Sequence, residues 1–169
     1  MSGLANINMK TPFNNHLKAL LILFFLVLMQ TAFGQKKYVK RYKGIADSLS
    51  AVYGIPASVI LGVAIIESGS GTSRNAKMLN NHFGIVGKNN LLQTKGIKTR
   101  YKQYPNVAAS YVDFCKIISR RKFYPKLKGN KDYKVWTDSI SKSNYSEVPE
   151  EWRKKINHAI KKSDLDDLD

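Results

Sequence analysis

The segment from Ala57 to Glu67 constrains the fold more than any other part of this 169-residue chain. Its residues suit a helix and are apolar on nearly every side, so the helix belongs in the middle of a hydrophobic core. Pro56 can open it, because its missing backbone N–H costs nothing there, and Gly69 and Gly71 stop it. The rest of the chain must surround this helix, and its length is that of one compact domain.

Amphipathic helices are predicted around the apolar segment. The first ends at Gly54 and carries its apolar stripe at spacings of three and four residues: Tyr38, Tyr42, Ile45, Leu49 and Val52. Further helices are expected over residues 74–79, 106–118, 132–140 and 149–162. Two strand-like pieces, 91–94 and 97–104, predict a small β-hairpin. The expected fold class is therefore α+β, helix-dominated, with one small β-hairpin lobe.

The N-terminus has the pattern of a secretory signal peptide. Lys10 and Lys18 precede the apolar run Ala19–Met29, and Ala32-x-Gly34 has the small-x-small form that signal peptidases accept. The run is shorter than the ~20 apolar residues of a typical transmembrane helix, so an uncleaved membrane anchor is the weaker alternative.

This pattern divides the chain into three parts. We expect residues 1–34 to be the signal peptide, residues 35–163 to be the functional domain and residues 164–169 to be a frayed acidic tail. The protein would then be exported to the periplasm or the extracellular cell envelope, with no membrane association after cleavage.

The charge of the chain predicts a polyanionic partner. There are 28 Lys and Arg against 12 Asp and Glu, a net charge of +16. Nucleic acid, an anionic membrane surface and an acidic cell-wall polymer would all qualify, and export argues against nucleic acid. Five basic residues would form a positive lip on the predicted hairpin, although an ordinary solvated face is an equally good interpretation: Lys88, Lys95, Lys98, Arg100 and Lys102.

Metal ions and other cofactors are not predicted. His82 and His158 have no Cys or carboxylate cluster at ligand spacing. Cys115, the only Cys of the chain, lies among apolar residues at helical spacing and is expected to be a buried, inert thiol.

Glu67 is the candidate for chemistry. It is the only carboxylate between Asp47 and Asp113, and it shares a helical face with Ile60. Burial disfavours the charged form of a carboxyl group and raises its pKa. An acid that is still protonated near neutral pH can donate the proton that glycosidic bond cleavage requires. From the pattern alone, a Glu67 that points to water or pairs with Arg74 is equally plausible.

The surroundings of Glu67 favour a carbohydrate ligand. The turn at residues 68–71 has few side-chain atoms, so a polymer can approach it closely. The loop at residues 80–84 supplies amides and an aromatic ring, and Tyr101, Tyr104 and Tyr145 supply rings with hydroxyls. Such groups suit N-acetyl sugars, which have apolar ring faces and polar edges.

Four motifs follow one another in an order typical of one enzyme family. They are Ala-Ile-Ile-Glu-Ser-Gly-Ser-Gly at 64–71, Asn-Asn-His-Phe-Gly-Ile at 80–85, Tyr-Lys-Gln-Tyr at 101–104, and Asn-Tyr-Ser at 144–146 with Pro149. Together they resemble glycoside hydrolase family 73, the bacterial cell-wall glucosaminidases, over roughly residues 40–160. The resemblance implies a lysozyme-like α+β fold and cleavage of the β-1,4 bond after N-acetylglucosamine in the glycan strands of peptidoglycan. We also expect a monomer.

The resemblance also implies residue roles. Glu67 would be the general acid, and Tyr145 would lie beside the reactive sugar. The expected substrate-binding positions, which line the groove or support its loops, are Asn80, Asn81, Phe83 and Tyr104.

One part of the family pattern is missing. Many members have a second carboxylate in the stretch that corresponds to residues 86–100, which contains no Asp or Glu here. Three accounts remain, in this order: attack by the 2-acetamido oxygen of the substrate, a water placed by the loop at Asn80 and Asn81, or a catalytically weak domain. The alternatives to a glucosaminidase are a lytic transglycosylase and a cell-wall-binding or assembly protein.

Overall fold

The computed structural model describes residues 13–169, without the side chains of residues 13–16 and 24–33. The chain divides into two units, Met1–Gly34 and Gln35–Asp169. Residues 1–12 of the predicted signal peptide lie outside the described residues, so its cleavage stays a prediction. None of the helices in the described part of the chain combines the length and hydropathy that a bilayer crossing requires.

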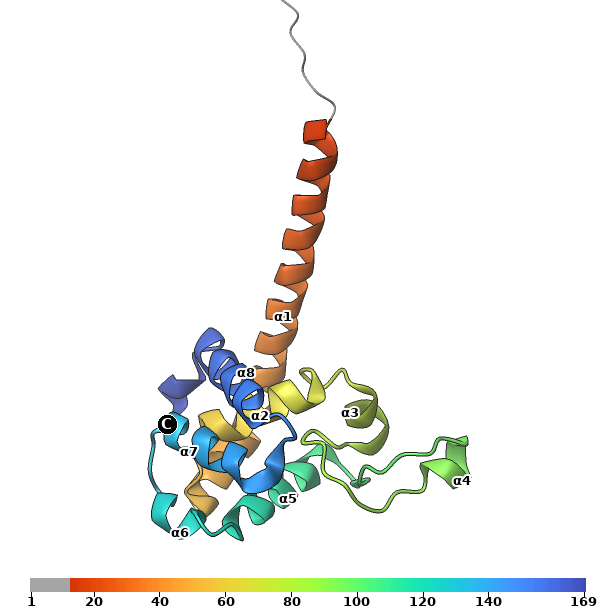
Figure 1. Cartoon of the computed structure of the whole chain (residues 1–169). Helices are drawn as coiled ribbons and strands as arrows, with labels where there is room; N and C mark the ends of the chain where they lie inside the picture. The colour runs from red at the N-terminus through yellow and green to blue at the C-terminus, as the bar shows by residue number, and fades with distance from the viewer. Residues whose placement is uncertain (1–12) are drawn as a thin grey trace, which may run out of the picture. The chain divides into compact units, whose positions relative to one another are not determined.

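Helices build the second unit (Figure 1). In chain order they are the end of α1 (Phe13–Tyr53), α2 (Ala57–Ser68), α3 (Arg74–Leu79), α4 (Leu91–Lys95), α5 (Val107–Ser119), α6 (Tyr124–Leu127), α7 (Tyr133–Ile140), the π-helical turn η1 (Ser141–Tyr145), α8 (Pro149–Lys162) and the 3-10 turn η2 (Leu165–Leu168). The helix-dominated part of the predicted fold class is therefore confirmed.

Three of the predicted helix starts are fixed by side-chain caps. Ser73 accepts a hydrogen bond from the backbone N–H of Ala76, and Asn106 accepts one from that of Ala109. Asp132 does the same for α7. Such caps satisfy backbone donors that a helix start leaves without partners. The apolar stripe of α1 is confirmed as well, except at Val52, whose side chain is exposed.

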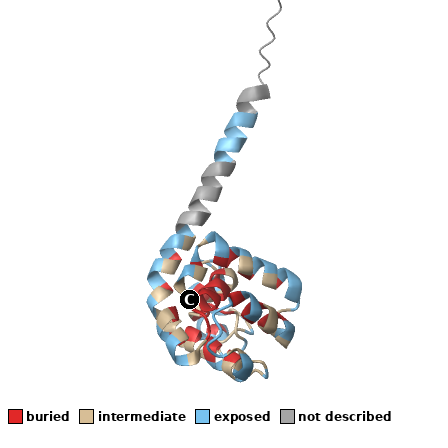
Figure 2. Ribbon diagram, turned by 90° about the vertical axis from the view of Figure 1, so that its left-hand side faces the viewer, coloured by how far each residue is buried: buried red, intermediate tan, exposed pale blue. Residues whose placement is uncertain are grey.

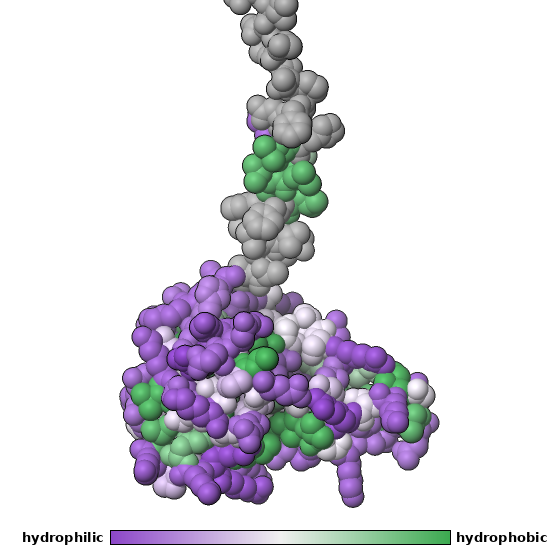
Figure 3. Space-filling model, viewed as in Figure 1, coloured by the Kyte–Doolittle hydropathy of each residue, from purple (hydrophilic) through white to green (hydrophobic). Residues whose placement is uncertain are grey.

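Helix α2 is the buried centre of the unit, as its sequence predicts. Every residue from Ala57 to Ile65 is buried, and Figure 2 shows the buried positions gathered in the interior. Helix α8 packs closely on α2 at Gly62, where an added Cβ would lie 2.7 Å from Cγ1 of Ile160. On the face seen in Figure 3, hydrophilic side chains cover most of this unit, as its charge predicts.

The predicted β-hairpin is wrong. The described residues contain no β-strand there, only an isolated antiparallel bridge between Val86 and Tyr101. Residues 91–95 form α4 instead, because Asn89 accepts a hydrogen bond from the backbone N–H of Leu91 and Gly96 ends the helix in a left-handed conformation.

Side-chain amides replace the β-ladder in this lobe. The Asn89 amide donates to the carbonyls of Thr99 and Tyr101 at 3.0 and 2.9 Å. A side chain that satisfies backbone carbonyls in this way competes with regular strand pairing. The alternation of apolar and polar residues in the sequence does not reveal that a side-chain amide takes the place of a strand partner.

The acidic tail is ordered rather than frayed. Residues 165–168 form η2, and Leu165 is buried. The Asp169 carboxylate accepts hydrogen bonds from both the backbone N–H and the hydroxyl of Ser58. It thereby caps α2, which has no side-chain cap of its own at Pro56.

Replacing Asp169 with Ala should destabilise the domain by about 1 kcal/mol, the usual cost of a lost helix cap. The cause is that α2 would begin with an unpaired backbone donor at Ser58. Urea unfolding followed by circular dichroism measures the change. Asp167→Ala is the matched control, because Asp167 is exposed. Equal stability of the two variants would show that the cap contributes nothing.

Candidate active site

Glu67 occupies the last turn of α2, immediately before a tight reversal of the chain. Gly69, Ser70 and Gly71 all adopt positive φ angles, of 56°, 54° and 78°. The buried Ser68 hydroxyl donates to the Ala64 carbonyl and accepts from the backbone N–H of Gly71 at 2.8 Å. The turn therefore has a fixed shape and few side-chain atoms, as the sequence predicts.

The Glu67 carboxyl group is partly buried and has one side-chain partner. Trp152 of α8 donates its indole N–H to Oε1 at 2.7 Å. In the described part of the chain, no Lys, Arg or His lies within 4.0 Å of this carboxylate. Burial raises the pKa of Glu67, and the Trp152 hydrogen bond opposes that rise only in part. The pairing with Arg74 that the sequence left open does not occur.

Gly84 leaves space beside this carboxyl group. Its φ of 65° is left-handed, and a Cβ added there would lie 3.3 Å from Oε2 of Glu67. A side chain at this position would be strained and would also crowd the acid. The Phe-Gly pair of the second motif therefore forms part of the immediate surroundings of Glu67.

Tyr145 lies close to Glu67, although 78 positions separate them in the sequence. Its hydroxyl donates to the Phe83 carbonyl at 3.0 Å, and its ring lies 5.4 Å from that of Trp152. Burial, and next the negative charge of Glu67, raise the pKa of Tyr145 well above its usual value. The two predicted catalytic residues thus come together, and the Tyr145 hydroxyl stays neutral.

The side chain of Asn81 holds the second motif in place. Its amide donates to the carbonyls of Ile85 and Lys102 at 2.8 and 2.9 Å. Its oxygen accepts from the backbone N–H of Phe83 and of Ile85. Asn81 is 1% exposed, so its position corresponds to loop support.

The other three expected substrate-binding residues also have structural partners. The Asn80 amide donates to the Tyr104 carbonyl at 3.0 Å. Phe83 is buried and stacks on Phe114, with the ring centroids 4.4 Å apart. Tyr104 is buried, and its hydroxyl donates to Asp113 at 2.8 Å. These contacts favour loop support over groove lining, and sugar binding by these residues stays a prediction.

Asp113 has a structural role in the loop lobe. It accepts from Lys102 at 2.6 Å and from Tyr104 at 2.8 Å. Burial works to raise its pKa, but these two hydrogen bonds and the Lys102 charge outweigh burial and lower it. Of the five cations in the predicted lip, Lys102 is thus paired with an acid.

Comparison with known proteins agrees with this geometry. The family described as glucosaminidase, mannosyl-glycoprotein endo-beta-N-acetylglucosaminidase, matches residues 43–165. The chain belongs to this family. The match includes Glu67, Tyr145 and Trp152, so the whole candidate site lies within the glucosaminidase domain.

Individual relatives support the same assignment. The exo-glucosaminidase LytG of Bacillus subtilis is 26% identical over 153 residues, with 80% of this chain aligned. This chain spans 54% of the length of LytG, about half of that relative.

Two solved structures share the fold. The catalytic domain of the Listeria monocytogenes autolysin Auto matches with a TM-score of 0.66 and 25% identity, covering 80% of this chain and 88% of that one. An N-acetylmuramoyl-L-alanine amidase structure from Staphylococcus aureus matches with a TM-score of 0.68 and 28% identity, covering 80% of this chain and 44% of that one. Both similarities agree with the fold that the four motifs imply.

A buried polar network lies behind the acid of this glucosaminidase domain. The Tyr38 hydroxyl lies 2.6 Å from Nδ1 of His82, 2.8 Å from the Tyr111 hydroxyl and 3.5 Å from the Ser68 hydroxyl oxygen. Burial lowers the pKa of His82 to about 4, so the imidazole is neutral at pH 7. Such a network fixes the turn after Glu67 without placing a second charge there.

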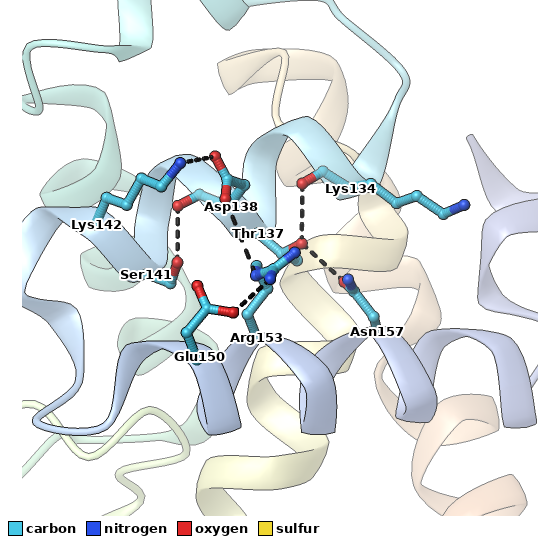
Figure 4. A network of polar contacts seen from close by, with 8 residues as sticks. All are labelled: Lys134, Thr137, Asp138, Ser141, Lys142, Glu150, Arg153 and Asn157. Atoms are coloured by element: carbon cyan, nitrogen blue, oxygen red, sulfur yellow. Dashed lines mark hydrogen bonds and ion pairs between the residues drawn. The ribbon is translucent and has the colours of Figure 1, made fainter.

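A second network joins α7, η1 and α8 of the glucosaminidase domain (Figure 4). Asp138 pairs with Lys142 at 2.8 Å, and Arg153 lies 3.9 Å from Asp138 and 2.5 Å from Glu150. Thr137 donates to Asn157 at 2.7 Å. These contacts fix the two segments from which Tyr145 and Trp152 reach Glu67.

Trp152 is the site residue that sequence reasoning missed. Its helical spacing predicts an inward-facing side chain, which is correct, since it is 5% exposed. Spacing does not reveal that its indole N–H meets a carboxyl group from α2. The only available signal was the general one that a buried Trp needs an acceptor for its N–H.

Proposed function

We propose that this protein is a peptidoglycan hydrolase that cleaves the β-1,4 bond after N-acetylglucosamine, with Glu67 as general acid. Membership of the glucosaminidase family supports the substrate class. The observation that carries the chemical role is the state of Glu67: a partly buried carboxyl group with a raised pKa that has, among the described residues, one neutral donor and no ion pair. Such an acid retains a proton that it can give to the leaving glycosidic oxygen.

The second half of the reaction needs a group other than a neighbouring carboxylate. Burial raises the pKa of Glu67 and the Trp152 hydrogen bond lowers it, and no carboxylate of the described chain contributes to the shift. Attack on C1 by the 2-acetamido oxygen of the substrate is the account that we favour. The Glu67 proton would pass to the leaving O4, and the resulting carboxylate would later accept a proton from the water that opens the cyclic intermediate.

Tyr145 is well placed to orient the acetamido group. Its hydroxyl proton is directed to the Phe83 carbonyl, so its oxygen retains lone pairs that can accept a hydrogen bond from the acetamido N–H. A water placed by the loop at Asn80 and Asn81 is the second account, and a catalytically weak domain is the third.

Mass analysis of the products from purified peptidoglycan tests this function. Reducing N-acetylglucosamine ends are the expected result. Anhydro-muramyl ends would identify a lytic transglycosylase instead. Binding to the wall without any cleavage would identify a cell-wall-binding or assembly protein.

We also propose that the protein acts in the cell envelope as an exported monomer, released from its signal peptide by cleavage after Gly34. Membership of the glucosaminidase family and the pattern of residues 1–34 support this proposal. Mass measurement of the protein recovered from a bacterial envelope fraction checks the cleavage point.

Replacing Trp152 with Phe should shift the pH dependence of cleavage upward. Activity requires protonated Glu67, so it is lost as the pH rises through the pKa of this group. The Trp152 hydrogen bond lowers that pKa, so its removal raises the pKa further and extends activity to higher pH. A pH profile of kcat/KM measures the shift. A high-pH limb that stays in place or moves down would contradict Glu67 as the titrating acid.

A further inference from the structure

A basic pocket is lined in part by Asn144, the residue that directly precedes Tyr145 of the candidate active site. It has a volume of about 790 Å³, and its lining comes from the turn between α5 and α6, from the end of α7 and from η1. The lining residues are Arg120, Arg121, Lys122, Phe123, Ser139, Lys142, Ser143 and Asn144. The pocket thus carries four cations and no carboxylate, and its volume is typical of sites that bind small ligands.

Three of these cations have no acidic partner. Lys142 is paired with Asp138 at 2.8 Å. Within the described residues, Arg120, Arg121 and Lys122 have no carboxylate within 4.0 Å. The Nε atom of Arg121 is buried and has no hydrogen-bond partner in the part of the chain that the structure describes, although a buried donor of this kind normally has one.

The backbone of this corner is fixed. The N–H of Arg121 donates to the Ile118 carbonyl at 3.0 Å, and the Arg121 carbonyl accepts from the N–H of Tyr124 at 3.0 Å. Phe123 packs edge-on against Trp136, with the ring centroids 6.3 Å apart. The cations therefore stand on a rigid turn, which reduces the entropy cost of ligand binding.

The pocket adjoins the chemistry through Tyr145. This residue directly follows Asn144 of the pocket lining, and its hydroxyl contacts the Phe83 carbonyl beside Glu67. The negative charge of Glu67 raises the pKa of the Tyr145 hydroxyl, and the positive charge of Arg121 lowers it. A ligand that extends from Glu67 past Tyr145 would reach the pocket.

We infer that this pocket binds a free carboxylate of a peptidoglycan stem peptide, which extends the glucosaminidase function proposed above. Every second sugar of a peptidoglycan strand carries an acidic peptide, so a strand cleaved at Glu67 brings carboxylates to either side of the scissile bond. Arginine guanidinium groups bind carboxylates through paired N–H donors. The domain would therefore prefer peptide-bearing strands to bare glycan.

The double variant Arg120→Gln/Lys122→Gln tests this inference. On intact peptidoglycan its KM should rise about tenfold at unchanged kcat, because charge-assisted hydrogen bonds to the substrate are lost. On glycan strands from which the peptides have been removed, its KM should equal that of the original protein. Arg121→Lys retains the charge without the paired donors and should show a smaller rise on intact peptidoglycan.

A control with the same loss of charge separates the pocket from general electrostatics. Lys116 and Lys162 are exposed and lie outside the pocket lining. Lys116→Gln/Lys162→Gln should leave KM on both substrates unchanged. An equal rise in both double variants would overturn the inference in favour of non-specific attraction.

Direct binding distinguishes failure of the inference from failure of the proposed function. The probe is the free tripeptide L-Ala-γ-D-Glu-diaminopimelate, titrated by NMR into the Glu67→Gln protein. Chemical-shift changes at the pocket residues, lost in the Arg120→Gln/Lys122→Gln background, are expected even where no cleavage is measured. Absence of tripeptide binding by a protein that cleaves peptidoglycan would overturn the subsite and leave the hydrolase function intact.

Discussion

Replacing Glu67 with Gln should reduce the release of muropeptides from purified peptidoglycan by about 10²- to 10⁴-fold, the usual contribution of a general acid. Gln has nearly the same shape and retains an oxygen that can accept the Trp152 hydrogen bond. It has no acidic proton, so the leaving glycosidic oxygen would depart unprotonated. High-performance liquid chromatography of the soluble products measures the rate. Unchanged release would exclude Glu67 as the acid.

The stability of the same variant separates lost chemistry from lost folding. Burial raises the pKa of Glu67 in the folded state above its unfolded value. The stability that the neutral form contributes is therefore fully present below the unfolded pKa and is lost as the pH rises through the folded pKa. Gln does not ionise, so Glu67→Gln should be at least as stable as the original protein at pH 8. Thermal unfolding of both proteins at pH 4 and pH 8 measures whether the stability of the original protein falls relative to that of Glu67→Gln as the pH rises.

Replacing Gly62 with Val should destabilise the domain by about 3 kcal/mol, at the upper end of the usual cost of overpacking a core. A Cβ at Gly62 would lie 2.7 Å from Cγ1 and 3.2 Å from Cδ1 of Ile160, so either helix α8 or the Ile160 side chain must move. For a domain of this size the melting temperature should fall by roughly 10 °C. Cleavage should also weaken, because α2 carries Glu67 and α8 carries Trp152.

Gly44 provides the matched control for this substitution. It lies inside α1, and an added Cβ would meet nothing within 4 Å. Val is a slightly better helix former than Gly, so Gly44→Val should change the stability by less than about 0.5 kcal/mol. Similar losses of stability in both variants would show that helix propensity, rather than the contact between α2 and α8, decides the outcome.

The sequence predicted the centre of the fold better than its edge. The buried helix α2 and the helices expected over residues 74–79, 106–118 and 132–140 are all present, because burial and helix capping are local signals. The β-hairpin was wrong because the Asn89 side chain satisfies the carbonyls that a strand partner would take. The frayed tail was wrong because the Asp169 carboxylate finds its partner at Ser58, 111 positions earlier.

The candidate site shows the same division. Composition and spacing identified Glu67, and the motifs added Tyr145, which the structure places beside it. The hydrogen bond from the Trp152 indole to Glu67 could not be predicted from the sequence, because its acceptor lies on another helix. In the sequence, Arg120, Arg121 and Lys122 are a run of cations of the kind usually found on a solvated surface. Only the structure shows that they line one pocket together with residues of η1.

The position of Tyr38 bears on the cleavage after Gly34 that is proposed above. A product that starts at Gln35 keeps Tyr38 on α1, where its hydroxyl joins His82 to Tyr111. Trimming a few residues further along would remove this ring and leave both partners buried without it, at a cost of about 1–3 kcal/mol for each unsatisfied group. If the chain is cleaved after Gly34, as proposed above, only Gln35, Lys36 and Lys37 can be removed in addition before the polar network loses Tyr38.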